Sequence, residues 1–247
     1  MEELKKYLKE EYEREFSGWD FSYLKNKMLE SPLTWNYESI IKNYIINSKT
    51  MLDLGTGGGE FLDSLEILPK ETFATEGYKP NVKIAQERLS KRNVIVKEVN
   101  EFDKLPFEDN YFDLIINRHE EYSLKEIKRL LKKDGVFITQ QVGGLNDIDI
   151  NYSLGAPSPD YFDWNLSKAL EEILNNDLEI VLYDENIGYT RFYDIGSLVY
   201  YLKCIPWQIN DFSIDKYISR LNVLNYIIKE KSFIDFINHR FILIVKK

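Results

Sequence analysis

Apolar residues follow a helical spacing near the start of the chain and a different rhythm further on. Leu4, Tyr7, Leu8 and Tyr12 recur every three or four positions, and the apolar residues of 37–45 do the same. This spacing predicts two N-terminal helices joined by an aromatic connector. From residue 50 onward, short apolar runs alternate with segments of helical period. Such alternation predicts a parallel sheet covered by helices.

The alternating region supplies enough apolar runs for a seven-stranded sheet. Strands are predicted at 50–54, 72–75, 94–97, 111–117, 135–142, 178–184 and 240–245. Helices are predicted at 80–92, at 123–132, at 194–203 and at 213–230, and a further helix ends at about residue 176. Gly135 is expected to stop the helix at 123–132. The predicted fold class is α/β, a Rossmann-like, doubly wound and mostly parallel sheet with helices on both faces.

No stretch rich in glycine, proline or serine divides the chain, so we predict a single domain over residues 1–247. Residues 1–47 would form an N-terminal helical cap, and residues 48–143 the ligand-binding core. Residues 144–247 would add a helical insertion and the last two strands.

Composition narrows the class of protein and its partners. Apolar residues make up 44% and charged residues 30% of the chain, which is typical of a folded protein. The net charge of -9 disfavours nucleic acid as a partner. The single cysteine, Cys204, can form no internal disulfide and no cysteine-based zinc site. No run approaches the roughly 18 apolar residues of a membrane span, so we expect a cytoplasmic protein without a membrane partner.

A glycine-rich turn follows the first strand of the predicted sheet. It reads Asp53-Leu-Gly55-Thr-Gly57-Gly-Gly59-Glu60 and leads into a helix. Glycines there permit positive φ and let a ligand lie against bare backbone. A dinucleotide fingerprint would need glycine where Glu60 stands, and a P-loop would need a lysine that is absent. The acid at Asp53 instead favours a cationic, amine-bearing ligand such as S-adenosylmethionine. The alternative is a turn that only closes a tight connection.

Further acids follow the next strands in order. Glu76 ends the second strand, where a carboxylate can accept two ribose hydroxyls, or can simply be a solvated acid. Glu101-Phe102 follows the third strand, and Tyr111-Phe-Asp113 opens the fourth. Each feature alone is a weak signal, whereas the ordered set is a strong one.

These motifs resemble the class I S-adenosylmethionine-dependent methyltransferases, most closely the type-11 methyltransferase domain, over about residues 48–143. The resemblance implies S-adenosylmethionine as cofactor, with the glycine turn holding its methionine part. Glu76 would then bind the ribose, Glu101 and the Phe102 backbone would read the adenine, and the Asn117 backbone would meet the methionine amine. The residues implied at the cofactor are Asp53, Gly55, Thr56, Gly57, Glu76, Gly77, Tyr78, Glu101, Phe102 and Asn117.

Two of these positions depart from the family pattern. The residue after the ribose acid is often aliphatic and packs on the adenine, but here it is Gly77, with Tyr78 beside it as a candidate for stacking. The usual adenine-reading aspartate is replaced by Glu101, which is one methylene longer.

The loop after the fourth strand is the candidate place for the chemistry. His119 has an unperturbed pKa near 6.5 and is a candidate general base, although it can equally orient the loop through backbone hydrogen bonds. Glu120 and Glu121 are candidates for solvated acids at the start of the next helix. No cluster of histidines or cysteines accompanies these residues, so no metal is predicted. The candidate acceptor-binding residues are Trp19, Trp35, Arg118, Gln141 and Arg191.

The resemblance therefore implies an enzyme that transfers a methyl group from S-adenosylmethionine to a small, aromatic or hydrophobic acceptor. Two alternatives stay open. One is an RNA methyltransferase on the same fold, which the acidic net charge disfavours. The other is a non-catalytic protein that only binds S-adenosylmethionine, since a fold does not decide between such functions.

Overall fold

The structure is a computed structural model that describes residues 2–16 and 19–247. Its contacts divide the chain into two compact units. Unit 1 comprises Met1–Leu33, Gly143–Trp164 and Asn186–Arg240, and unit 2 comprises Thr34–Val142, Asn165–Glu185 and Phe241–Lys247. The division at Leu33 falls within the predicted cap of residues 1–47. That the chain is a single domain stays a prediction.

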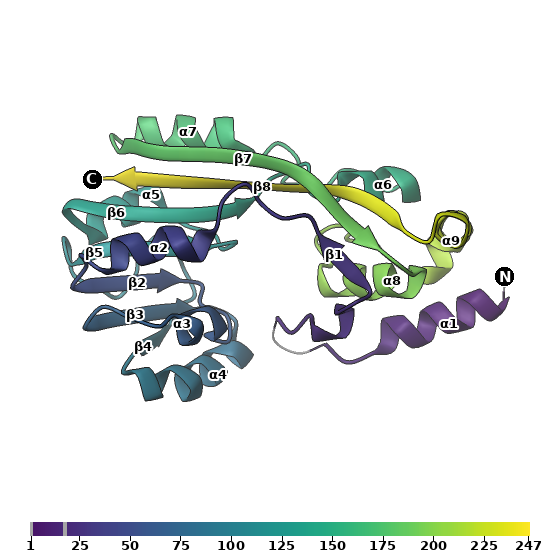
Figure 1. The fold of residues 1–247 in the computed structure, drawn as a ribbon, viewed down its shortest axis with the longest axis horizontal. Helices are drawn as coiled ribbons and strands as arrows, with labels where there is room; N and C mark the ends of the chain where they lie inside the picture. Colours follow the sequence, from purple (N-terminus) through teal and green to yellow (C-terminus); the bar gives the residue numbers. More distant parts are fainter. Residues whose placement is uncertain (1, 17–18) are drawn as a thin grey trace. The chain divides into compact units, whose positions relative to one another are not determined.

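The elements follow one another along the chain as in Figure 1. The strands are β1 (Met28–Glu30), β2 (Thr50–Leu54), β3 (Glu71–Glu76), β4 (Ile95–Glu98), β5 (Phe112–Arg118), β6 (Leu131–Val142), β7 (Glu179–Phe192) and β8 (Ile234–Lys246). The α-helices are α1 (Glu2–Glu13), α2 (Tyr37–Ile45), α3 (Glu60–Ser64), α4 (Lys79–Leu89), α5 (Leu124–Leu130), α6 (Ile148–Leu154), α7 (Leu166–Asn175), α8 (Ile195–Cys204) and α9 (Ile214–Lys231). Short 3₁₀ turns lie at Ser22–Leu24 and Ser90–Arg92. No helix in these described residues is long and apolar enough to cross a membrane.

The predicted fold class is confirmed, with one more strand than expected. The sheet has the order β1-β7-β8-β6-β5-β2-β3-β4, and β2 pairs in parallel with both β3 and β5. The described residues form eight strands, so the prediction of seven was wrong. The added strand is β1, which pairs antiparallel with the end of β7. A strand of three residues is too short to show the alternation of apolar and polar positions. The sequence around β1 therefore predicted only the aromatic connector.

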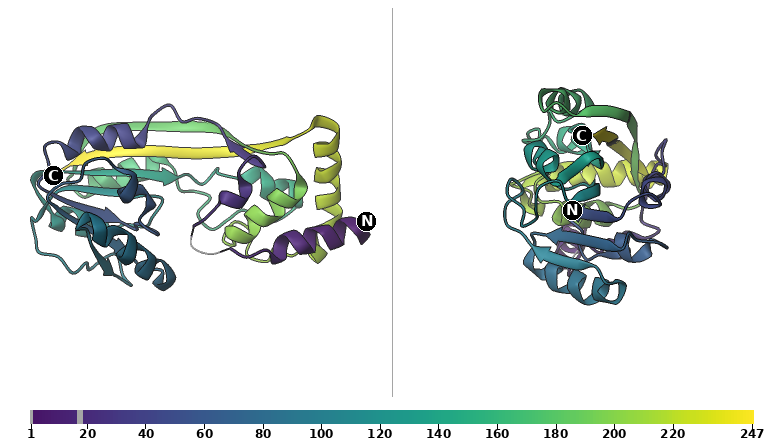
Figure 2. Two further views of the ribbon diagram at one scale, coloured as in Figure 1. Left: turned by 60° about the horizontal axis from the view of Figure 1, so that its bottom comes forward. Right: turned by 90° about the vertical axis from the view of Figure 1, so that its left-hand side faces the viewer.

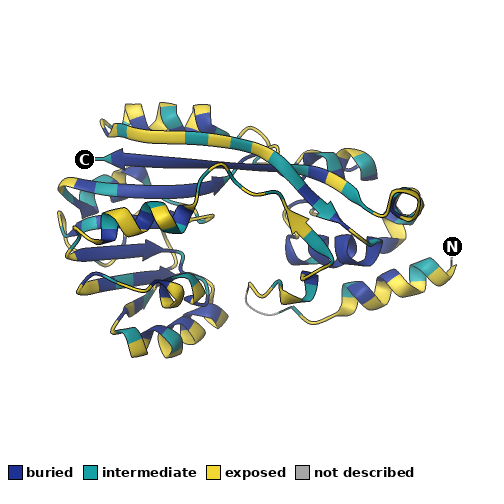
Figure 3. Cartoon of the chain, in the orientation of Figure 1, coloured by how far each residue is buried: buried dark blue, intermediate teal, exposed yellow. Residues whose placement is uncertain are grey.

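Unit 2 is built around β2, whose five residues are all buried. Figure 3 shows this strand dark along its whole length, as expected for a central parallel strand covered on both faces. Helix α2 lies in front of the sheet and α5 behind it in Figure 1. Asn36 begins α2, because its side chain accepts a hydrogen bond from the Ser39 N–H. Ile41 and Ile45 on α2 then join the core formed by Met51, Leu114 and Ile138.

Gly135 does not end a helix, contrary to the prediction. Helix α5 ends at Leu130, and β6 begins at once with Leu131 paired to Phe112. A side-chain carbon at Gly135 would lie 2.9 Å from the Lys132 carbonyl oxygen and 3.0 Å from that of Phe112. The glycine is therefore needed where the two strands approach closely at a register irregularity.

Unit 1 is mainly helical. Helix α1 packs on α8 and α9, and α6 packs on α9, an arrangement that Figure 2 shows from a second side. Leu8 of α1 is fully buried against Leu198 and Tyr200 of α8 and Leu221 of α9. Helix α6 was not predicted as a separate element; its first residue follows Asp147, which adopts a positive φ.

Asp113 joins three strands of unit 2 and gives a first prediction. Its Oδ2 accepts hydrogen bonds of 2.9 Å from the N–H groups of Lys49 and Thr50, and its Oδ1 accepts one of 2.8 Å from Lys132 Nζ. Burial raises the pKa of Asp113, but these donors outweigh it and lower the pKa to about 2.

We expect Asp113→Asn to lower the free energy of unfolding at pH 7 by about 1–3 kcal/mol, the range for hydrogen bonds to a charged group. The carboxylate's contribution is present above the unfolded pKa of 3.8 and is lost as the pH falls through about 2, so the difference from wild type should fade there. Urea unfolding measured across this range tests it, with Glu87→Gln on the exposed face of α4 as control. An equal loss at every pH would contradict the assignment.

Candidate functional site

The glycine turn after β2 adopts the backbone that the sequence predicts. Gly55, Gly57 and Gly59 have φ values of 69°, 61° and 84°. These values lie in the left-handed region, where a Cβ is unfavourable. The turn is anchored to the neighbouring strand by Thr56, whose N–H donates to the Thr75 carbonyl oxygen at 2.9 Å.

Glu76 at the end of β3 closes the turn. Its Oε2 accepts from the Gly57 N–H at 2.7 Å, and its Oε1 accepts from the Tyr78 N–H at 2.8 Å. The residue is only 4% exposed, and this burial raises the pKa of Glu76, partly offset by the backbone donors. The Gly77 N–H also acts on this carboxylate, and a carboxylate can accept about four hydrogen bonds, so the group can still accept a hydroxyl donor from a ligand.

Asp53 is the second acid at the turn, and it is buried with 5% exposure. Burial raises its pKa to about 7; the Thr56 hydroxyl and Arg118 act against this shift, and Glu76 adds to it. Arg118 is exposed, and its guanidinium lies 5.1 Å from the centre of the Phe61 ring.

Glu120 is a third acid at the same turn. A side-chain carbon at Gly55 would lie 2.6 Å from Cβ and 2.7 Å from Oε2 of Glu120, so this side chain lies directly over the glycine. Burial raises the pKa of Glu120, and the negative charges of Glu76 and Glu121 raise it further. Glu120 is thus no solvated acid, which was one expectation from the sequence. Its carbonyl oxygen is held at 3.1 Å by Gln141 Nε2.

Asn117 is fully buried at the end of β5, opposite Leu54 of β2. Its carbonyl oxygen accepts a hydrogen bond of 2.8 Å from the Tyr37 hydroxyl. Its Oδ1 accepts from Thr139 Oγ1 and Gln141 Nε2, while its Nδ2 has no partner among the described residues. An orphaned buried donor beside the glycine turn is a place for a ligand acceptor.

His119 is fixed by the neighbouring strand. Its N–H donates to the Gln140 carbonyl oxygen at 2.8 Å, and its φ is 64°. Trp35 Nε1 donates to Gln140 Oε1 at 2.8 Å, so the amide nitrogen of Gln140 faces His119 Nε2 at 3.0 Å. With this amide orientation His119 Nε2 accepts, and the ring is the neutral Nδ1–H tautomer. The Nε2 lone pair is then already used.

Comparison with known proteins gives the family of the core. Residues 52–139 match the family described as methyltransferase domain, type 11. This part of the chain is therefore a methyltransferase domain. The predicted family is therefore confirmed over residues 52–139, and with it the cofactor that this domain implies.

One sequence relative and two solved structures are similar to parts of the chain. The ribosomal protein L11 methyltransferase of Dictyoglomus thermophilum is 31% identical over 121 residues, which is 46% of this chain and 39% of that protein. A methyltransferase candidate from Bacillus halodurans C-125 superposes with a TM-score of 0.59 at 14% identity, over 85% of this chain and 98% of that one. The YcgJ protein of Bacillus subtilis gives 0.58 at 17% identity, over 85% and 97%. At these identities the two structures support the fold alone.

The predicted cofactor residues of the methyltransferase domain gather only in part. Asp53, Glu76 and the three glycines converge at the turn, in agreement with a donor that carries positive charge. Glu101 lies on the surface after β4, and Phe102 is half-buried. Tyr78 is 57% exposed beside Gly77, and a Cβ at Gly77 would lie 3.1 Å from the Val99 carbonyl oxygen. The close approach of the Val99 carbonyl oxygen thus explains why glycine, and not an aliphatic residue, stands at position 77.

The predicted acceptor residues are mostly engaged within the protein. Gln141 holds Asn117 and Glu120, as described above. Arg191 forms two hydrogen bonds to Asp235, of 2.7 and 2.8 Å, and lies 3.6 Å from the centre of the Phe233 ring. Trp19 is 49% exposed and packs edge to face on Trp207 at 5.8 Å.

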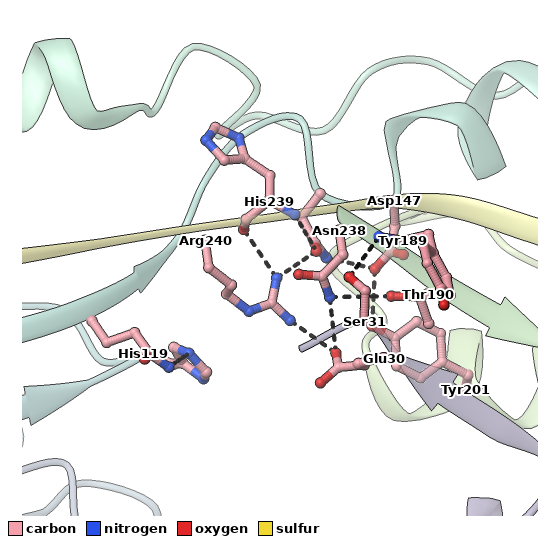
Figure 4. A network of polar contacts seen from close by, with 12 residues as sticks. Glu30, Ser31, His119, Asp147, Tyr189, Thr190, Tyr201, Asn238, His239 and Arg240 are labelled. Atoms are coloured by element: carbon pink, nitrogen blue, oxygen red, sulfur yellow. Dashed lines mark hydrogen bonds and ion pairs between the residues drawn. The ribbon is translucent and has the colours of Figure 1, made fainter. Parts of the chain in front are cut away.

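Unit 1 contains a buried polar network that the sequence did not suggest. Figure 4 shows Arg240 donating to Glu30 at 3.1 Å, with Asn238 donating to the same Oε1 at 3.1 Å. Nearby, the Tyr201 hydroxyl donates to Asp147 Oδ2 at 2.9 Å, and burial raises the pKa of Asp147 to about 7. The network fixes the segment before α6 against β8.

Sequence reasoning missed several polar residues of the domain. Tyr37 was assigned only to a helix face, and Asn81 was not considered, although it is fully buried with neither side-chain polar atom partnered among the described residues. Both residues lie within the first three positions of a helix. Polar side chains at such positions often cap the helix, so the sequence did not suggest that these two are buried.

A separate cavity of about 930 Å³ lies in unit 2 and includes none of the predicted site residues. It is lined by Phe73, Lys97, Phe107, Tyr111, Glu126 and Arg129, among others. Its charged groups are largely paired with protein: Arg129 binds Glu126 and Asp109, and Lys97 binds the Pro106 carbonyl oxygen. No group of three or more His, Cys, Asp or Glu placed to hold a metal ion occurs in the described part of the chain.

The buried acid Asp53 gives a second prediction. Its folded pKa of about 7 lies above the unfolded value of 3.8, so folding stability is lost as the pH rises between these values. We expect Asp53→Asn to melt higher than wild type at pH 8, by about 4 °C or more, with a smaller gain at pH 5. Thermal melts at both values test this, and a gain that does not depend on pH would contradict it.

Proposed function

We propose that the protein transfers the methyl group of S-adenosylmethionine to a small, aromatic or hydrophobic acceptor. The observation that carries the proposal is the glycine turn closed by Glu76 and flanked by two more carboxylates. A phosphate-bearing nucleotide would face three carboxylates at this turn. Among the described residues, Arg118 is the cation that acts on Asp53. A sulfonium with a free amine meets favourable charge instead.

The residues at the turn have distinct roles in holding the donor. Gly55 and Gly57 give it bare backbone, and Glu76 accepts its ribose hydroxyls with the lone pairs that Gly57 and Tyr78 leave free. The Asn117 carbonyl oxygen accepts the amine beside the bond from Tyr37. When bound, the donor supplies an already activated methyl group.

Catalysis on this scaffold needs little chemistry from the protein. Orienting two reactants can supply about 7–11 kcal/mol, whereas a general base adds about 10²- to 10⁴-fold in rate. The neutral His119 with its Nε2 bound to Gln140 supports an orienting role for this residue. Positioning is then the main source of rate.

The acceptor is proposed to be aromatic or hydrophobic because the candidate positions include two tryptophans, Trp19 and Trp35, beside the two arginines Arg118 and Arg191. Trp19 and Trp207 present large ring surfaces, whereas Arg191 is already paired with Asp235. Planar or hydrophobic molecules suit such surfaces. The acceptor in the relative's name, ribosomal protein L11, carries little weight here, because the match spans 39% of that protein. RNA remains disfavoured by the net charge of -9.

Binding of the donor gives a third prediction. Titration calorimetry is expected to show binding of S-adenosylmethionine and S-adenosylhomocysteine, and no binding of NAD. Glu76→Ala should weaken both by about 1–3 kcal/mol, since hydroxyl donors lose a charged acceptor. Glu98→Ala is the matched control, because Glu98 is the exposed register partner of Glu76 on β4. Tighter binding of NAD than of either ligand would refute the proposal.

His119 gives a fourth prediction. We expect His119→Gln to slow turnover by less than about ten-fold and to leave the acid limb of the pH–rate profile unchanged, because its Nε2 lone pair is already used. Turnover is measured as S-adenosylhomocysteine formed with an acceptor found by screening small aromatic molecules. A loss of about 10²-fold or more, together with loss of the acid limb, would instead establish His119 as the general base.

A further inference from the structure

The carboxylate of Glu120 lies where a ligand on the glycine turn would have to pass or bind. The side chain stands over Gly55, with Oε2 2.7 Å from the place of a Cβ on that glycine. Its backbone cannot swing away freely, because Gln141 Nε2 holds the Glu120 carbonyl oxygen at 3.1 Å. A ligand on Gly55 therefore contacts this carboxylate.

Glu120 has no cationic ion-pair partner in the part of the chain that the structure describes. Among residues 2–16 and 19–247, no lysine, arginine or histidine forms an ion pair with it, and its Oε1 accepts only the Glu121 N–H, at 3.2 Å. Its charged neighbours Glu76 and Glu121 are both negative. Asp53 and Arg118, which act on each other, also lie at this turn. Burying such a group is costly unless a positive charge arrives.

A second observation also points to a ligand at this place. Asn117, opposite the residue before Gly55, is fully buried and keeps Nδ2 without a partner in the described structure. The carboxylate of an amino-acid group can accept from this amide, and a positive charge elsewhere on the same ligand can meet Glu120. The donor proposed above carries such a group and, in addition, a sulfonium.

We propose that Glu120 is a specificity-determining residue that favours the sulfonium of S-adenosylmethionine over the uncharged sulfide of S-adenosylhomocysteine. This inference rests on the proposed function. During transfer the acceptor's lone pair forms the new bond to carbon, and the electron pair of the S–C bond stays on sulfur. The sulfur thereby loses its positive charge, and the acceptor loses a proton to water or keeps the charge.

Loss of that charge has a direct consequence for turnover. Before transfer, Glu120 is neutralised by the sulfonium; afterwards it is again an uncompensated, partly buried carboxylate. The product complex is therefore destabilised relative to the donor complex, which speeds product release. The amine of the amino-acid group is the same in donor and product, so only a contact with sulfur separates the two ligands.

The test compares the two ligands in matched variants. Calorimetry at pH 7.5 gives the Kd of S-adenosylmethionine and of S-adenosylhomocysteine for wild type, Glu120→Gln and Glu121→Gln. Glu121 is the control, because it is exposed one residue away and has the same charge. We expect Glu120→Gln to weaken S-adenosylmethionine about ten-fold or more and S-adenosylhomocysteine less than three-fold, and Glu121→Gln to change neither by more than two-fold.

Other outcomes overturn the inference in distinguishable ways. Equal weakening of both ligands would place Glu120 at the amine, and no weakening of either would leave it as a steric feature of the empty turn. An equal effect of Glu121→Gln would mean that the overall negative charge of the loop, and not the position of Glu120, distinguishes the two ligands. If neither ligand binds wild type, the proposed function itself fails.

A second variant covers the case in which Glu120→Gln does not fold. Glu120→Asp keeps the charge on a side chain one methylene shorter, and we expect its donor-to-product affinity ratio to fall between those of wild type and an uncharged residue. Wild-type binding at pH 5 and pH 8 gives a third readout. The ratio should fall at pH 5, where Glu120 and its acidic neighbours Asp53 and Glu76 take up protons, and a ratio that rises there would contradict the inference.

Discussion

The hydrogen bond from the Gly57 N–H to the Glu76 carboxylate links the ends of two parallel strands, and the rest of the site depends on it. It fixes the turn after β2 to the residue from which α4 starts, since the other oxygen of Glu76 binds the Tyr78 N–H. The turn can reach Glu76 only with the positive φ values of its glycines. One carboxylate therefore organises the strand end, the turn and the helix start together.

This arrangement brings three acidic side chains close together at one turn. Asp53, Glu76 and Glu120 are buried or half-buried within one turn, and burial raises the pKa of each. Their mutual repulsion is offset only in part, by backbone donors at Glu76 and by Arg118 at Asp53. A cationic ligand at this turn would reduce the repulsion, so the proposed site would exchange stability for affinity, as is common where function requires unfavourable charge.

The sequence predicted the parts of the molecule that depend on local pattern. Strand β2 was predicted with its observed bounds, because the short apolar run of Met51, Leu52 and Leu54 leads directly into the glycines. Local pattern did not predict three features: strand β1, the place of Gly135 within β6, and the burial of Glu120. Each depends on a partner distant in sequence: Thr190 for Glu30, Phe112 for Gly135 and Gly55 for Glu120. A side chain's charge shows in the sequence, but the group that it faces does not.

The loop after β5 takes its shape from the strand beside it. In the parallel register, Asn117 pairs with Thr139 and Arg118 with Gln140. Successive side chains on a strand point to opposite faces, so the neighbours Gln140 and Gln141 serve different partners. Gln140 binds Trp35 and His119, while Gln141 binds Asn117 and Glu120. A slip of one residue between β5 and β6 would exchange these two amides and release both His119 and Glu120. The register of two apolar strands thus determines where the loop's polar groups stand, and the chemistry of the site rests on the packing of the core.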